Sequence, residues 1–136
     1  MKLYVVDDSV PLRERLVSTA AEIGNIEIVG QSGEANEAIE QILRLRPHVV
    51  ILDIRVIGGS GIYLLETIKR EAPATIAIMF TNFCIAQYRD RCEKIGANYF
   101  FAKSTDFEKL VEVLTGLARH DKLKPTGNSQ TFPHTR

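Results

Sequence analysis

The chain has 136 residues, which suits one domain with a buried core. Lys plus Arg and Asp plus Glu both number 17, so the balanced charge gives no support for broad binding to nucleic acid or to a membrane surface. No stretch approaches the roughly 18 apolar residues of a membrane span, and the first apolar run is too short for a signal peptide. We therefore expect a cytoplasmic protein with no direct contact to nucleic acid or membrane.

Short apolar runs alternate with segments of helical periodicity along most of the chain. The apolar runs predict strands at residues 3–6, 26–29, 49–52, 76–80 and 99–102. The other segments predict helices that begin near Pro11, Glu34, Ile62, Ile85 and Phe107. Because the strands are apolar on both faces, this alternation is typical of a doubly wound α/β domain with a parallel sheet. We expect that domain over residues 1–120 and a flexible polar tail over 121–136.

The fourth predicted helix is expected to be lined by Ile85, Tyr88 and Cys92, and the chain's other cysteine, Cys84, stands at its start. If Cys84 and Cys92 lie on one helix, their eight-residue spacing separates them by about 12 Å, which is too far for a disulfide. We expect both to be free thiols.

The sequence also predicts the local structure of two short segments that precede predicted helices. The sequence GGSG at residues 58–61 lacks the lysine and the spacing of a phosphate-binding loop, and it indicates a flexible loop before the third helix. Thr105 and Glu108 have the spacing of a capping box, so they are expected to open the last helix.

Polar residues follow four of the five predicted strands. Asp7 and Asp8 follow the first strand, Asp53 the third, Thr81 the fourth and Lys103 the fifth. Each residue alone is most simply a cap, a turn residue or a solvated charge. Because ligands of an open parallel sheet bind outside the carboxyl ends of its strands, however, we expect these side chains to meet at one edge. Crowded carboxylates favour a Mg²⁺ ion, and a carboxylate beside such an ion can attack phosphorus.

In these residues the chain resembles the response-regulator receiver domain of two-component signalling. The resemblance covers residues 1–120. It is carried by the acidic pair of VVDDS, the aspartate of VVILDIRVIGGSG, the threonine of IMFTN, the lysine of GANYFFAKS, and Gly61. It implies a flavodoxin-like (βα)5 fold with a five-stranded parallel sheet in the order 2-1-3-4-5.

The resemblance also implies a role for each site residue. Asp53 would accept a phosphoryl group from a histidine kinase, and Lys103 and Thr81 would contact that group. Thr81 and Phe100 would form the switch that responds to phosphorylation. The implied Mg²⁺ ligands are Asp7, Asp8, Asp53 and the backbone carbonyl of Arg55.

The chain departs from the family pattern at four positions near this site. Ile57 and Ser104 stand where the family usually has proline, and the peptide before Ser104 is therefore expected to be trans. Asn82 is larger than the usual residue and is expected to narrow access to Asp53. Arg55 lies two residues after Asp53, at a position that tunes dephosphorylation in the family.

The resemblance implies a single-domain response regulator similar to the chemotaxis regulator, without an output domain. The expected partners are a histidine kinase or histidine phosphotransfer protein and an unidentified output protein. The chain is expected to be a monomer or a weak dimer linked to phosphorylation, and not a turnover enzyme. Alternatives are a phosphorelay intermediate and a receiver-like scaffold that is not phosphorylated. A phosphatase of the haloacid dehalogenase type is disfavoured, because its second acid would stand at Arg55.

Overall fold

A computed structural model describes residues 1–120 of the chain. The tail predicted over residues 121–136 lies outside the described residues. The elements follow one another in the order β1 Lys2–Val6, α1 Val10–Ile23, β2 Glu27–Ser32, α2 Ala35–Leu45, β3 Val49–Leu52, β4 Arg55–Val56, β5 Gly59–Ser60, α3 Gly61–Glu71, β6 Ile76–Thr81, α4 Ala86–Ile95, β7 Tyr99–Ala102 and α5 Phe107–Arg119.

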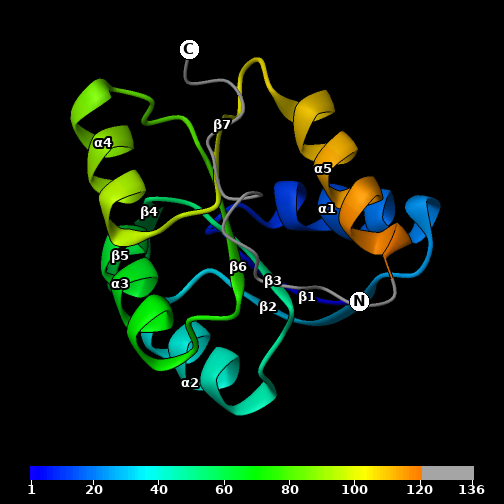
Figure 1. The fold of residues 1–136 in the computed structure, drawn as a ribbon, viewed down its shortest axis with the longest axis horizontal. Helices are drawn as coiled ribbons and strands as arrows, with labels where there is room; N and C mark the ends of the chain where they lie inside the picture. Colours follow the sequence, from blue (N-terminus) through cyan, green and yellow to red (C-terminus); the bar gives the residue numbers. More distant parts are fainter. Residues whose placement is uncertain (121–136) are drawn as a thin grey trace.

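The long strands form one parallel five-stranded sheet in the order β2-β1-β3-β6-β7. Numbered among themselves along the chain, these strands have the predicted order 2-1-3-4-5. Helices α1 and α5 cover one face of the sheet, and α2, α3 and α4 cover the other (Figure 1). The predicted doubly wound, flavodoxin-like fold is confirmed.

The sheet separates two apolar cores, and β1 shows how its strands supply both. Tyr4 and Val6 pack in the core on the α2, α3 and α4 side, whereas Leu3 and Val5 pack in the core on the α1 and α5 side. All four side chains are fully buried. A buried side chain of this size stabilises the fold by about 1.5–3 kcal/mol, so a strand apolar at every position contributes to both layers.

Helix α4 differs from its prediction. It begins at Ala86, and Ile85 is its N-cap, so Cys84 lies before the helix. Ile85 is 50% exposed and Tyr88 is 36% exposed, which leaves only Cys92 of the three predicted inner residues buried. The apolar spacing was therefore a poor guide to the inner face of α4. Both cysteines are free thiols, as predicted.

The segment from Arg55 to Ser60 is paired rather than a featureless loop. Its two short strands, β4 and β5, form an antiparallel hairpin. The hydroxyl of Ser60 then accepts a hydrogen bond from the N–H of Ile62 and caps α3. The prediction of a flexible loop at residues 58–61 missed this pairing, in which Arg55 pairs with Ser60 and Val56 with Gly59.

The predicted capping box at α5 is wrong. The N-cap is Asp106, and its side chain does not cap its own helix. Instead, Oδ2 of Asp106 accepts a hydrogen bond of 2.9 Å from the N–H of Ala102 at the end of β7. Thr105 donates its hydroxyl hydrogen bond to Oδ1 of Asp106. The buried carboxylate thus joins β7 to the start of α5.

No peptide bond among the described residues is cis, so the peptide before Ser104 is trans, as predicted.

Candidate functional site

Three of the predicted site residues meet at one ammonium group. Nζ of Lys103, after β7, lies 2.6 Å from Oδ2 of Asp7 and 2.7 Å from Oδ2 of Asp53. Asp7 follows β1 and Asp53 follows β3, so the carboxyl ends of three strands supply the cluster. The two carboxylates are buried, with Asp7 2% and Asp53 5% exposed. The lysine therefore offsets two buried negative charges that would otherwise repel.

Asp8 completes an acidic group with the other two carboxylates. One oxygen from each of Asp7, Asp8 and Asp53 lies within 4.8 Å of the others, and Asp8 is exposed. Carboxylate oxygens gathered at an open edge match the donor set that Mg²⁺ prefers. The residues present therefore fit a hard divalent cation.

Burial and hydrogen bonding shift the pKa values of this cluster. Burial raises the pKa of Asp7 above its ordinary value of 3.8, although hydrogen bonds from Lys103 and Ser9 act in the opposite direction. Burial alone would lower the pKa of Lys103, but its hydrogen bonds to Asp53 and Asp7 outweigh this effect and raise the pKa above 10.5. Lys103 is therefore a stable cation at neutral pH.

The β1–α1 loop has a structural role as well as an acidic one. Oδ1 of Asp7 accepts a hydrogen bond of 2.9 Å from the N–H of Ser9. Ser9 is the N-cap of α1, and its hydroxyl accepts from the N–H of Leu12. Asp7 thus closes the capped turn before α1 and also contributes its other oxygen to the site. Ser9 was not predicted as a site residue, although a serine before Pro11 is a recognisable cap signal.

A hollow lies next to Asp53, and Arg55 and Phe83 are among the residues that line it. The guanidinium carbon of Arg55 is 5.5 Å from the centre of the Phe83 ring. The residues that line the hollow are Asp8, Ser9, Leu12, Asp53, Arg55, Asn82, Phe83 and Lys103. Asn82, which is expected to narrow access to Asp53, thus lines the same hollow as Arg55. Phe83 was missed as a site residue, because its position depends on the turn after β6.

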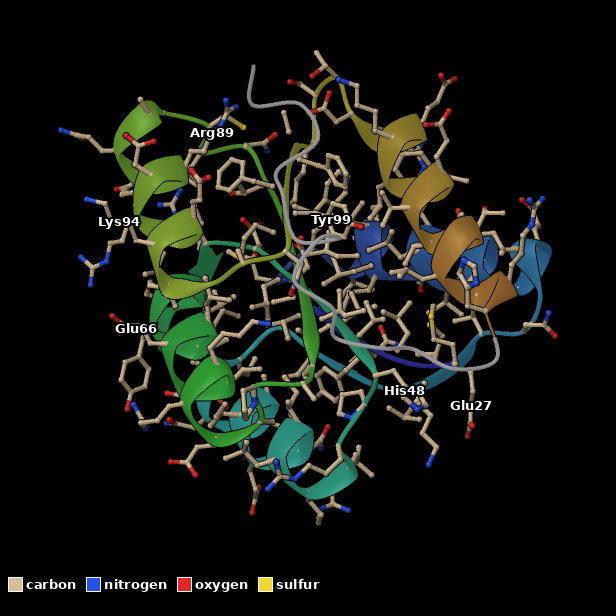
Figure 2. The ribbon with its side chains drawn as sticks, in the orientation of Figure 1. Glu27, His48, Glu66, Arg89, Lys94 and Tyr99 are labelled. Atoms are coloured by element: carbon tan, nitrogen blue, oxygen red, sulfur yellow. The ribbon has the colours of Figure 1, made fainter. Side chains whose placement is uncertain are left out.

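Thr81 and Phe100, the predicted switch residues, are both fully buried. Oγ1 of Thr81 accepts a hydrogen bond of 3.1 Å from the N–H of Phe83. The guanidinium of Arg89 lies 5.4 Å from the centre of the Phe100 ring. Figure 2 shows Arg89 on the side of α4 that faces β7, where Tyr99 begins the strand. Neither Thr81 nor Phe100 lines the hollow, so both lie behind the site.

Ile57 and Gly61 explain how the loop after Asp53 keeps its shape. The N–H of Ile57 donates a hydrogen bond of 2.9 Å to the carbonyl oxygen of Gly33, which a proline at this position could not do. A Cβ atom at Gly61 would overlap the carbonyl oxygen of Asp53, so only glycine fits there. The departure at Ile57 thus replaces a rigid residue with a hydrogen bond.

A second hollow lies at the opposite edge of the sheet, next to the amino ends of β1 and β2. Its lining includes Glu27 and His48, which lie near each other in Figure 2, and also His120. Nδ1 of His48 accepts a hydrogen bond from the N–H of Lys2. The acidic cluster is absent from this lining, so the candidate site is the carboxyl edge.

The fold and the site together define a class of protein. It is a doubly wound α/β domain with an acidic pocket, bridged by a lysine, at the carboxyl edge of its sheet. The chain belongs to the response regulator receiver domain family, whose pattern matches residues 3–115. The resemblance drawn from the strand-end residues is thereby confirmed. No helix within residues 1–120 is long and apolar enough to cross a membrane.

The chain is similar to parts of larger regulators. It is 31% identical over 124 residues to a response regulatory protein of Vibrio cholerae, covering 90% of this chain and 50% of that protein. It is 32% identical over 105 residues to a protein-glutamate methylesterase/protein-glutamine glutaminase of Alkalilimnicola ehrlichii, covering 76% of this chain and 27% of that enzyme. The chain therefore spans half or less of the length of these relatives.

The fold also matches a solved receiver. The response regulator domain of Thermotoga maritima CheB superposes with a TM-score of 0.76 at 25% identity, covering 90% of this chain and 98% of that chain. In that case the match extends over almost the whole of the solved domain. The five-stranded arrangement described above is thus that of a receiver domain.

Proposed function

We propose that this chain is a phosphoacceptor of two-component signalling, which receives a phosphoryl group on Asp53 in a Mg²⁺-dependent reaction. One observation carries the proposal: the buried carboxylate of Asp53 is held 2.7 Å from the ammonium of Lys103. The same carboxylate shares an oxygen cluster with Asp7 and Asp8. Family membership over residues 3–115 adds the expectation that the donor is a phosphohistidine.

The chemistry is a transfer of phosphorus from nitrogen to oxygen. An oxygen of Asp53 attacks the phosphorus, the P–N bond breaks as the P–O bond forms, and the released imidazole takes up a proton. Oδ2 of Asp53 accepts from Lys103, whereas Oδ1 has a long hydrogen bond of 3.5 Å from the N–H of Arg55. Oδ1 is therefore the less engaged oxygen and the one we assign as nucleophile.

Positive charge stabilises the transfer. Lys103 neutralises Asp53 before the reaction and can pair with a phosphoryl oxygen afterwards, because its ammonium carries three donors. The proposed Mg²⁺ ligands are Asp7, Asp8, Asp53 and the backbone carbonyl of Arg55. When bound, the ion would offset charge on the acidic cluster and on the transferring group.

Phosphorylation would then change binding to a protein partner. Thr81 is the residue we assign to sense the new phosphoryl group, and Phe100 the residue that transmits the change to the face of α4 and β7. The proposed donor is a histidine kinase or a histidine phosphotransfer protein in the cytoplasm. On this proposal the chain is not a turnover enzyme.

The test is intact-protein mass spectrometry after incubation with acetyl phosphate and Mg²⁺. The chain contains no tryptophan, so the mass is a more direct readout than fluorescence. We expect one phosphoryl adduct on the native chain, none on Asp53→Asn and none without metal. Asp90→Asn, the same chemical change at a position on α4 away from the site, is the matched control and should keep the adduct.

Asn82 lines the hollow and is expected to narrow access to Asp53, so the test also needs a second kind of phosphodonor. Incubation with phosphorylated histidine kinases supplies the phosphoryl group from a protein, which does not depend on access of a small molecule. An adduct on Asp53→Asn, or no adduct with either kind of donor, would overturn the proposal and favour the scaffold alternative.

A further inference from the structure

The loop between β2 and α2 touches both loops that carry the candidate site. This loop consists of Gly33 and Glu34, and neither residue was predicted to belong to the site. The carbonyl oxygen of Gly33 accepts from the N–H of Ile57 at 2.9 Å, and the carbonyl oxygen of Ile57 accepts from the N–H of Ala35 at 2.8 Å. These two bonds form a short parallel bridge between Glu34 and Ile57. The segment after Asp53 is thereby tied to the start of α2.

Gly33 also packs directly against the acidic pair. A Cβ atom at Gly33 would lie 2.9 Å from Cα of Asp8 and 3.1 Å from the carbonyl oxygen of Asp7. Both neighbours are backbone atoms and cannot rotate away, so a side chain here has to displace the β1–α1 loop. The absence of a side chain lets the two backbones approach closely.

Other contacts hold the β1–α1 loop, which carries Asp7 and Asp8, against Gly33. The N–H of Asp7 donates to the carbonyl oxygen of Ser32 at 3.0 Å, immediately before Gly33. The guanidinium of Arg13 donates to the carbonyl oxygen of Asp7 and, at 3.0 Å, to the side chain of Gln31 on β2. The backbone at Asp7 and Asp8 therefore has little freedom to move away from Gly33.

We propose that Gly33 is a positioning residue of the site, which sets the separation between Asp8 on one loop and the Arg55–Ile57 segment on the other. This inference rests on the proposed function, since Asp8 and the carbonyl of Arg55 are proposed Mg²⁺ ligands. A side chain at Gly33 pushes the backbone of Asp8 outward and widens the group of oxygens. Loss of the N–H at Ile57 removes the hydrogen bond that ties the Arg55–Ile57 segment to Gly33.

The experiment is a titration of the full chain with Mg²⁺ alone, followed through the amide signals of Asp8 and Arg55 by NMR. We expect Gly33→Ala to raise the Kd for Mg²⁺ by about threefold to tenfold, the range of one hydrogen bond's net contribution. Gly116→Ala on α5 is the matched control, because a Cβ built there meets no atom within 4 Å beyond the adjoining backbone of its own helix and its chain neighbours, and its Kd should equal that of the native chain.

A second pair of variants tests the other side of Gly33. Ile57→Pro removes the N–H that bonds to Gly33, whereas Ile57→Ala removes the side chain and keeps that N–H. We expect Ile57→Pro to raise the Kd for Mg²⁺ at least about twofold, and Ile57→Ala to leave it unchanged. If Gly33→Ala does not fold, this pair decides the question.

The outcomes separate this inference from the proposed function. A native chain that does not bind Mg²⁺ overturns the proposed function. A native chain that binds Mg²⁺, with the same Kd in Gly33→Ala and Ile57→Pro, overturns the positioning role alone. A lower Tm with an unchanged Kd also overturns the positioning role, because a purely structural glycine changes stability and not ion affinity.

Discussion

Lys103 donates a hydrogen bond of 2.7 Å to Asp53, although 50 residues separate them in the sequence. The same ammonium reaches Asp7, so one cation holds carboxylates from two other strands. The shared cation links the stability of the fold to the proposed chemistry of the site, and the two can be measured separately.

Replacing Lys103 by methionine should destabilise the metal-free protein, because it leaves two buried carboxylates without their shared cation. We expect a loss of roughly 2–3 kcal/mol in the free energy of unfolding at pH 7, somewhat below the cost of breaking a fully buried ion pair. Urea unfolding in EDTA measures it. Lys94→Met, at an exposed position on α4 (Figure 2), is the control, and an equal loss in both variants would contradict the prediction.

Asp7 should make the stability of the metal-free protein depend on pH. Burial raises its folded pKa above the ordinary value of 3.8, so the folded state holds the proton more tightly than the unfolded state does. Its contribution is therefore fully present below about pH 4 and is lost as the pH rises through the folded pKa.

Asp7→Asn is the variant that isolates this effect. Its free energy of unfolding relative to the native chain should increase as the pH rises from acid toward neutral, because the asparagine does not ionise. Urea unfolding of both proteins across that range, in EDTA, measures the difference. A difference that stays constant with pH would refute the role of Asp7.

The free energy of unfolding should depend on Asp106, at the start of α5, and hardly on Thr105. Asp106→Ala removes the acceptor of the Ala102 N–H and should cost roughly 1–2 kcal/mol, since it leaves a partly buried donor unpaired. Thr105→Ala should change the free energy of unfolding by less than about 0.5 kcal/mol. Thermal unfolding of the two variants decides between this arrangement and a capping box, which predicts the larger loss for Thr105.

Asn82 should limit access of small phosphodonors to Asp53. It lines the hollow with Arg55 and Phe83, so Asn82→Ala should widen the entrance. We expect phosphorylation by acetyl phosphate to become about threefold faster, which corresponds to about 0.65 kcal/mol of barrier. The mass adduct is followed over time, with the exposed Asn36→Ala as control. An unchanged rate would show that Asn82 does not gate the hollow.

Phosphorylation of Asp53 should alter the surroundings of Thr81 and Phe100. Both side chains are fully buried, so a small movement of either changes the packing around it. We expect NMR signals of the Phe100 ring and the Thr81 methyl to shift when Asp53 is fully modified, together with signals from α4. Asp53→Asn treated in the same way should show no shift. Fixed signals around Phe100 in the fully modified protein would exclude the switch.

The local sequence was a good guide where one physical preference dominated. Runs such as Val49–Leu52 had to become buried strands, and their alternation with amphipathic helices predicted the sheet correctly. It was a poor guide at α4, where Ile85 and Tyr88 have helical spacing but lie exposed. Apolar periodicity shows which residues share one face of a helix, but it does not show whether that face packs against the sheet.

The sequence by itself determined the fold class and the set of chemical groups at the strand ends, because parallel strands bring their carboxyl ends to one edge whatever lies between them. Only the tertiary structure decided how those groups are held. The bridge from Lys103 to two acids, the bond from Asp106 back to β7 and the contact of Gly33 with Asp8 all join segments distant in the chain or turned back on themselves. Such contacts depend on exact backbone separations, which follow from packing rather than from local preference.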